Sequence, residues 1–397
     1  MTPGLNDSGT LWLGDSDTKE LWCSGILYKT YRVQKRLNLL ALGDDFLPGQ
    51  ADSNHNITIH FFSKVLSVPA IANARICVAF LAILLIVSSF QASAPSVWAD
   101  DEPPTGDQSP TGPIFDEPTY PVKATLGLPY AQGMIYHPTD TARFFPRNLT
   151  LDVYQPDEDV AQHRPVVLLV HSGGFWTGDS LMKSMVRAGN YFAERGWVCF
   201  SINYRLHGDR AIAPTGWLKN RPTYAATRDA KAAIRWIRAN AKTYRIDPNS
   251  IVAYGGSAGG YIGAALAASD ESDFRDELLT NEAESKLLQA THLEQSSQVQ
   301  AVVSHWGSGL LLELLKEYDG RDRFDSDDAP LLIIHGTEDK VVPYHHAEDL
   351  LKNYRSKIEH FRLDGFGHSA WAAKVNGDSL LDAVYPFMQQ ALNLSAK

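Results

Sequence analysis

Short apolar runs alternate with amphipathic stretches from about residue 149 to the end of the chain. The middle runs are continuously apolar, as expected of strands buried on both faces of a parallel sheet, whereas the first and last alternate. The pattern predicts strands at residues 149–156, 165–171, 197–204, 250–255, 299–306, 330–336 and 360–365.

Helical periodicity fills the intervals between these strands. Residues 222–243 place Ala226, Ala230, Ala233, Ile237 and Ala241 on one stripe, and the final segment repeats such a stripe after Asp378, its predicted cap. The polar interval 270–298 is predicted to be a surface helical insertion. Alternating strands and helices predict an α/β fold, with a mostly parallel central sheet and helices on both of its faces.

The front of the chain has a different pattern. Residues 76–90 are almost entirely apolar, follow Lys64 and Arg75, and precede the small residues 92–94. This order is typical of a secretory signal, with cleavage after Ala94 or Ala99. The run is shorter than the roughly 20 residues of a membrane-spanning helix. We therefore expect export to the periplasm or the exterior, and the alternative is retention of the segment as a membrane anchor.

These patterns divide the chain into four parts. Residues 1–75 show no sustained period and are predicted to be a poorly structured extension, or a spurious one from an upstream start codon. Residues 76–99 form the signal-like segment, and residues 100–121, rich in proline and acid, are predicted to be a disordered linker. The catalytic domain is expected at residues 122–397.

Composition narrows the class of partner. The chain has 397 residues, 44% of them hydrophobic, and a net charge of −10, without a basic run that would hold a phosphate backbone. A nucleic-acid partner is therefore not expected. The three cysteines, Cys23, Cys77 and Cys199, provide neither a disulfide framework nor a cysteine-rich metal site. We predict no metal.

The clearest candidate for chemistry is Ser257, in the G-x-S-x-G pattern of residues 255–259. The pattern follows a predicted strand and precedes an alanine-rich helix, which is the context of a nucleophile on a sharp strand-to-helix turn. If the G-x-S-x-G pattern is taken without its context, the alternative is a structural Gly-Ser turn that takes no part in catalysis. A phosphate-binding loop is not favoured, because Tyr261 stands where that loop requires lysine.

A serine nucleophile needs a base and an acid that orients the base. Asp339 follows one predicted strand and His368 follows the next, so both fall at the carboxyl edge of the sheet where such sites assemble. Glu338 is the rival acid, one residue nearer the strand. Three other histidines, His335, His345 and His346, are predicted to be structural or exposed.

An oxyanion hole is predicted in the turn after the strand 165–171. Gly173 and Gly174 allow backbone N–H groups to reach a substrate, and the Ala258 N–H completes the set. A plain Gly-Gly turn is the alternative.

These motifs together resemble the α/β-hydrolase superfamily, in particular its hormone-sensitive-lipase-like and feruloyl-esterase-like (BD-FAE-like) carboxylesterases. The resemblance rests on the turn at 171–174, the GGSAGG elbow and HGTEDKVVP, and it covers about residues 122–395. Ser172 replaces the first glycine of the family's H-G-G-G turn. The resemblance implies a serine carboxylic-ester hydrolase with a small or minimal cap, without a cofactor, and by analogy with acyl groups on polysaccharide or on small esters as substrates.

Aromatic residues near these motifs are candidates for lining the substrate cleft: Phe175, Trp176, Trp217, Trp306 and Phe366. Two other functions stay open from the sequence. One is a serine peptidase of the prolyl-oligopeptidase type, although no propeller domain precedes the predicted catalytic domain. The other is a binding protein that uses a hydrolase fold without catalysis.

Overall fold

The computed structural model describes residues 112–140, 142–214 and 221–397. The predicted extension 1–75, the signal-like segment 76–99 and Trp217 lie outside the described residues. Within the described part of the chain, none of the helices combines the length and the apolar character needed to span a bilayer.

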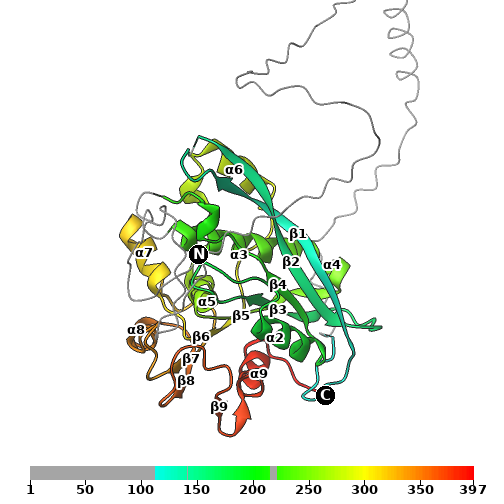
Figure 1. Cartoon of the computed structure of the whole chain (residues 1–397). Coiled ribbons are helices and arrows are strands. Elements are labelled where there is room, and N and C mark those ends of the chain that lie inside the picture. The colour runs from blue at the N-terminus through cyan, green and yellow to red at the C-terminus, as the bar shows by residue number, and fades with distance from the viewer. Residues whose placement is uncertain (1–111, 141, 215–220) are drawn as a thin grey trace, which may run out of the picture. The chain divides into compact units, whose positions relative to one another are not determined.

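One eight-stranded sheet organises the described chain (Figure 1). Its strands lie in the order β1-β2-β4-β3-β5-β6-β7-β8. The strands β3 to β8 run parallel to one another, whereas β2 pairs antiparallel with both β1 and β4. The bounds are β1 Val122–Tyr136, β2 Phe144–Pro156, β3 Arg164–Val170, β4 Val198–Ile202, β5 Ile246–Gly256, β6 Ala301–His305, β7 Leu331–Gly336 and β8 Ile358–Leu363. The predicted fold class is confirmed.

Helices cover both faces of this sheet because the side chains of each central strand alternate between two apolar cores. In β3, Val166 and Leu168 belong to one core, whereas Val167 and Leu169 belong to the other. The first core includes residues of α3 (Arg221–Ala239), α5 (Ala258–Ala268), α7 (Leu310–Asp319) and α8 (His345–Asn353). The second includes residues of α2 (Lys183–Ala193) and α9 (Leu380–Ala391).

The remaining elements are short: the helices α4 (Ala241–Tyr244) and α6 (Glu282–Gln289), the 3-10 turns η2 (His207–Asp209) and η4 (Asp276–Leu278), and the hairpin of β9 (Lys374–Val375) with β10 (Asp378–Ser379). Helix α9 is capped by Ser379, whose side chain accepts from the Asp382 N–H, so the cap lies one residue after the predicted Asp378.

The sequence placed the start of the domain too late. Residues 112–121, predicted to belong to a disordered linker, pack against the domain in the described structure. Ile114 is 2% exposed and forms a bridge with Ala396, and the Phe115 N–H donates to the Arg195 carbonyl at 3.0 Å. A single apolar side chain and a few backbone bonds order this segment, and a composition average does not detect them.

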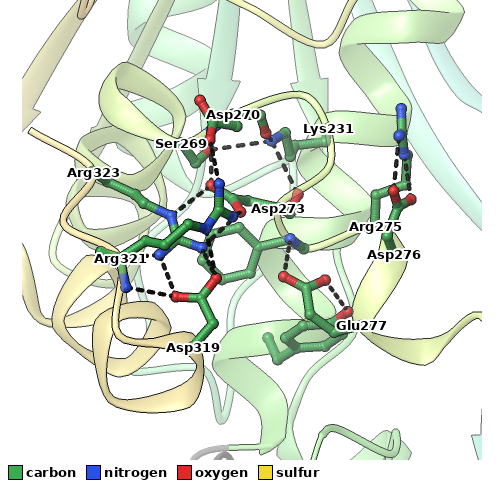
Figure 2. A network of polar contacts seen from close by, with 12 residues as sticks. Lys231, Ser269, Asp270, Asp273, Arg275, Asp276, Glu277, Asp319, Arg321 and Arg323 are labelled. Atoms are coloured by element: carbon green, nitrogen blue, oxygen red, sulfur yellow. Dashed lines mark hydrogen bonds and ion pairs between the residues drawn. The ribbon is translucent and has the colours of Figure 1, made fainter. Parts of the chain in front are cut away.

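The polar interval 270–298 contains η4 and α6, as the predicted helical insertion requires, and charged side chains anchor its start (Figure 2). The Asp273 carboxylate accepts from Arg323 at 2.8 Å and from Arg321 at 3.1 Å, both in the segment after α7. Lys231 of α3 donates to the Asp273 carbonyl at 3.0 Å. Burial lowers the pKa of Lys231 to about 8. The insertion is therefore fixed to the helical layer and not free to move as a flap.

Candidate active site

Ser257 stands at the junction of β5 and α5, on the turn that the sequence predicted. Its backbone has φ 55° and ψ −120°, a conformation that non-glycine residues rarely adopt. The Ser257 N–H donates to the carbonyl of His305 at 2.9 Å, which ties this turn to the end of β6. The strained conformation is therefore held by the neighbouring strand, and it directs the hydroxyl away from the helix that follows.

The glycines around Ser257 allow α5 to approach the sheet closely. A Cβ atom at Gly259 would lie 2.1 Å from the carbonyl oxygen of Val170, at the end of β3. No side chain fits there without displacing backbone. Small residues in the elbow are thus required by packing as well as by the turn.

His368 joins Ser257 to Asp339. The Ser257 hydroxyl lies 3.0 Å from Nε2 of His368, and Nδ1 of His368 lies 2.7 Å from Oδ2 of Asp339. The other carboxylate oxygen of Asp339 accepts two backbone N–H bonds, from Val341 at 2.8 Å and from Val342 at 2.9 Å. The carboxylate is therefore fixed, and its contact with Nδ1 favours the tautomer in which Nε2 can accept the serine proton.

The rival residues occupy other places. Glu338 is exposed, whereas Asp339 is 5% exposed and faces the imidazole. His335 is fully buried, and its Nε2 donates to the Val342 carbonyl at 2.8 Å while lying 3.5 Å from the Asp339 carboxylate. Burial lowers the pKa of His335, so this imidazole stays neutral beside the acid. The structure thus selects Asp339 and His368 as the partners of Ser257.

The turn after β3 lies next to the elbow. Gly173 has φ +118° and its carbonyl accepts from the N–H groups of Trp176 and Thr177, at 3.0 and 3.2 Å. A Cβ atom at Gly173 would lie 1.9 Å from the Thr177 carbonyl oxygen, so only glycine closes this turn. Ser172 donates its hydroxyl hydrogen to the Gly256 carbonyl at 2.8 Å. The substituted position of the turn therefore bonds directly to the residue before Ser257.

His171, at the start of this turn, is buried and stacks on Tyr204, with ring centroids 4.1 Å apart. Its Nδ1 lies 2.6 Å from the Ser172 carbonyl, and burial lowers its pKa. The Tyr204 hydroxyl donates to the His171 carbonyl at 2.8 Å. This histidine supports the turn and is not placed to exchange protons with a substrate.

Ser257 opens into a cavity of about 270 Å³. Gly174 and Ala258, two of the three predicted oxyanion donors, line it together with Ser257; Gly173 is not among the lining residues. The other walls are largely apolar: Phe175, Thr223, Tyr261, Leu310, Leu311, Leu314, Val341 and Val342. The insertion 270–298 contributes no lining residue, so it is not a lid over this cavity.

The aromatic candidates have different positions. Phe175 lines the Ser257 cavity. Trp176 is 66% exposed, stacks on His207 and lines a neighbouring cavity of about 380 Å³ instead. Phe366 is 41% exposed in the loop before His368 and does not line the Ser257 cavity. Trp306 is wrongly predicted as a cleft residue: it is fully buried and packs edge-on against His368, with ring centroids 6.1 Å apart.

The sequence reasoning missed the leucines of α7 and the valines after Asp339 as wall residues. The signal was present in the apolar run at 310–315 and in the two valines of HGTEDKVVP. Apolar residues on a helix normally point into the core, and nothing in the periodicity distinguishes those that border a cavity.

One group in the described chain has the spacing of metal ligands. His345, His346 and Asp349, at the start of α8, have candidate ligand atoms that all lie within 4.8 Å of one another. Two of the three are exposed, and the group shares no residue with the Ser257, His368 and Asp339 constellation.

Comparison with known proteins agrees with this architecture. Residues 151–324 match the BD-FAE family model, a segment that contains Ser257 and the 171–178 turn and ends before Asp339. A probable carboxylic ester hydrolase, LipM of Mycobacterium tuberculosis, is 27% identical over 233 residues, covering 52% of this chain and 48% of the relative. Esterase LipQ of the same organism is 26% identical, covering 50% and 47%.

The chain thus spans about half the length of these curated relatives. Among solved structures, the truncated form of a carbohydrate esterase from gut microbiota is similar at a TM-score of 0.50 and 22% identity, covering 71% of this chain and 100% of that one. This likeness concerns the fold.

A parallel sheet with a serine on its strand-to-helix turn, and with an acid and a histidine after the next strands, defines an α/β-hydrolase. Residues 151–324, which match the BD-FAE family model, are thus similar to the BD-FAE type of α/β-hydrolases.

Proposed function

We propose that this protein hydrolyses carboxylic esters through an acyl-enzyme, with Ser257 as nucleophile. The observation that carries the proposal is the continuous chain of contacts from Ser257 Oγ to His368 Nε2, at 3.0 Å, and from His368 Nδ1 to Asp339, at 2.7 Å. The names of the relatives support ester hydrolysis as the reaction class. The roles of the individual residues rest on the geometry.

In the first half-reaction, Ser257 Oγ attacks the ester carbonyl carbon while His368 Nε2 takes the hydroxyl proton. Asp339 stays ionised and stabilises the imidazolium that forms. Backbone N–H groups of Gly173, Gly174 and Ala258 are proposed to bind the oxyanion. The ester C–O bond then breaks, the alcohol leaves with the proton from His368, and the acyl group stays on Ser257.

In the second half-reaction, a water molecule attacks the acyl carbonyl while His368 accepts its proton. The bond to Ser257 Oγ breaks, and the proton returns from His368 to the serine. The carboxylic acid is released and the resting hydroxyl is restored. Each proton that leaves Ser257 or water thus passes through the same imidazole nitrogen.

The cavity beside Ser257 supports short acyl groups. Its walls carry aliphatic and aromatic side chains, and about 270 Å³ is slightly below the usual range for drug-sized ligands. We expect acetyl to butyryl esters to be hydrolysed faster than octanoyl or longer ones.

Hydrolysis of p-nitrophenyl acetate, butyrate and octanoate, with acetylated xylan as a polymer substrate, tests this function. The natural protein should release p-nitrophenol, and Ser257→Ala should lose activity by several orders of magnitude while keeping its melting temperature. Cleavage of dipeptidyl-proline anilides without ester hydrolysis would instead support the peptidase. Absence of both activities would support the binding protein.

Export of the protein is proposed separately, from the apolar segment 76–90. N-terminal sequencing of protein recovered from the periplasm or medium tests it. A mature start at Pro95 or Asp100 supports a cleaved signal, whereas retention of residues 1–90 supports a membrane anchor.

A further inference from the structure

A second cavity lies between β1, α3 and α6, and none of its lining residues belongs to the Ser257 cavity. Three arginines border it: Arg205 after β4, and Arg228 and Arg235 on α3. They are 3%, 5% and 1% exposed. Three guanidinium groups so fully removed from water require compensation, because burying an unpaired charge is costly.

Arg205 is fully compensated. It donates to Asp229 at 2.7 Å and to Glu284 at 3.4 Å, and these are the two carboxylates that line the cavity. Both acids therefore neutralise the same arginine. The charges around the cavity leave an excess of positive charge at Arg228 and Arg235.

Among the residues that the structure describes, neither of these two guanidinium groups finds a partner for one of its nitrogens. Arg228 donates through Nη1 to the Arg275 carbonyl at 2.7 Å, and its Nη2 has no acceptor. Arg235 donates through Nε and Nη2 to the carbonyl and hydroxyl of Thr291, at 2.8 and 2.9 Å, and its Nη1 has no acceptor. Both unpartnered atoms are buried and belong to residues that line the same cavity.

Acids on the neighbouring insertion do not supply the missing acceptor. The Glu271 carboxylate accepts from Ser296 and Ser297, and the Glu277 carboxylate accepts from Tyr224 and from the Phe274 N–H. Burial, followed by the nearby charge of Arg228, lowers the pKa of Arg235 to about 10. The Arg235 guanidinium therefore remains cationic near neutral pH.

We propose that this cavity binds one small monovalent anion, such as chloride, between Nη2 of Arg228 and Nη1 of Arg235. The anion supplies the missing acceptor for both nitrogens and cancels the excess charge. The free volume of this cavity is about 20 Å³, which suits a single monatomic ion and not a polyatomic anion such as phosphate. One of the lining residues, Gln132, is exposed.

Occupation of this site connects the insertion to the helical layer, because Arg235 also holds Thr291 directly after α6. An ion that binds the folded chain and not the unfolded chain raises the melting temperature as its concentration increases. The inference is independent of ester hydrolysis, and its test does not use activity.

The experiment compares melting temperatures of the full chain in sodium chloride and in sodium gluconate at equal ionic strength. We expect chloride to raise the melting temperature by about 3 °C. Arg235→Gln and the milder Arg228→Lys should lose this difference. The matched control is Arg164→Gln, a buried arginine whose guanidinium bonds to Asp159, Gly196 and Tyr120, and it should keep the difference.

A crystal grown in bromide gives the direct readout, which needs no variant. An anomalous peak between Arg228 Nη2 and Arg235 Nη1 is the expected result. A water molecule in place of the halide overturns the proposal, and so does a chloride response that persists in both cavity variants.

Discussion

Ser172 lies in the turn after β3, and its hydroxyl connects two loops that a glycine at this position would leave unconnected. Its bond to the Gly256 carbonyl, at 2.8 Å, joins the turn that carries the proposed oxyanion donors to the residue before the nucleophile. The spacing between donors and nucleophile decides how well an oxyanion is stabilised. Ser172 is therefore a positioning residue in this account.

Ser172→Ala should lower kcat for p-nitrophenyl acetate by about fivefold, since one hydrogen bond is worth about 1 kcal/mol. KM should change little, because the side chain bonds to backbone and does not line the Ser257 cavity. Steady-state kinetics check this, with the melting temperature as the control for folding. An unchanged kcat would show that the bond has no positioning role.

Variants of the adjacent acids Glu338 and Asp339 test which of them orients the imidazole of His368. Asp339→Asn should reduce kcat by about 10⁴-fold, because an amide cannot hold the imidazole in the required tautomer. Glu338→Gln is the matched control and should retain nearly full activity, since Glu338 is exposed. Kinetics of the two variants on one ester decide the assignment, and the reverse ranking would contradict it.

At the scale of elements, the contact of α5 with the end of β3 sets where Ser257 stands. Two glycines of α5 differ in the atoms that an added Cβ would meet. A Cβ at Gly259 would lie 2.1 Å from the Val170 carbonyl oxygen, whereas a Cβ at Gly263 would lie 3.1 Å from a methyl group of Val302, a side chain that can shift. The position of Ser257 thus depends on the close approach of the α5 backbone to the Val170 carbonyl.

Gly259→Ala should destabilise the fold by about 1–3 kcal/mol or more, because backbone must move to admit the methyl group. Gly263→Ala should cost much less, since alanine also favours the helix. Chemical denaturation of both variants measures the difference. Equal losses at the two positions would contradict the packing argument.

The sequence predicted the strands of the main sheet from β2 to β8 and missed β1. The continuously apolar strands β3 to β7 were found because both of their faces are covered. The long edge strand β1 was missed, since most of its first half is exposed and Gly127, Pro129 and Gly133 interrupt its pattern.

Ser257, Asp339 and His368 were predicted together because each follows a strand. Trp306 was wrongly predicted to line the cleft, because the sequence does not indicate whether an indole at the end of a strand points into the core or into a cleft.

At the scale of the whole molecule, the described domain begins before the predicted boundary at residue 122. Arg164, 1% exposed, donates to the Pro113 carbonyl and, at 3.0 Å, to the Tyr120 hydroxyl. The Tyr385 hydroxyl of α9 donates to the Phe115 carbonyl at 2.7 Å. Residues 112–121 therefore satisfy buried donors of the domain itself.

Two truncated chains test this boundary. A chain that begins at residue 122 should melt well below one that begins at residue 112, because it leaves the Arg164 guanidinium short of acceptors and uncovers the site of Ile114. Thermal unfolding of the two chains gives the comparison. Identical melting temperatures would show that the segment contributes nothing to the fold.

Ser257 is proposed to be the nucleophile of an ester hydrolase. The most direct test is to treat the full chain with a fluorophosphonate and to locate the adduct by peptide mass spectrometry. We expect a single adduct on Ser257, lost in Ser257→Ala and formed much more slowly in His368→Ala. An unlabelled Ser257 in protein that still hydrolyses p-nitrophenyl acetate would contradict it.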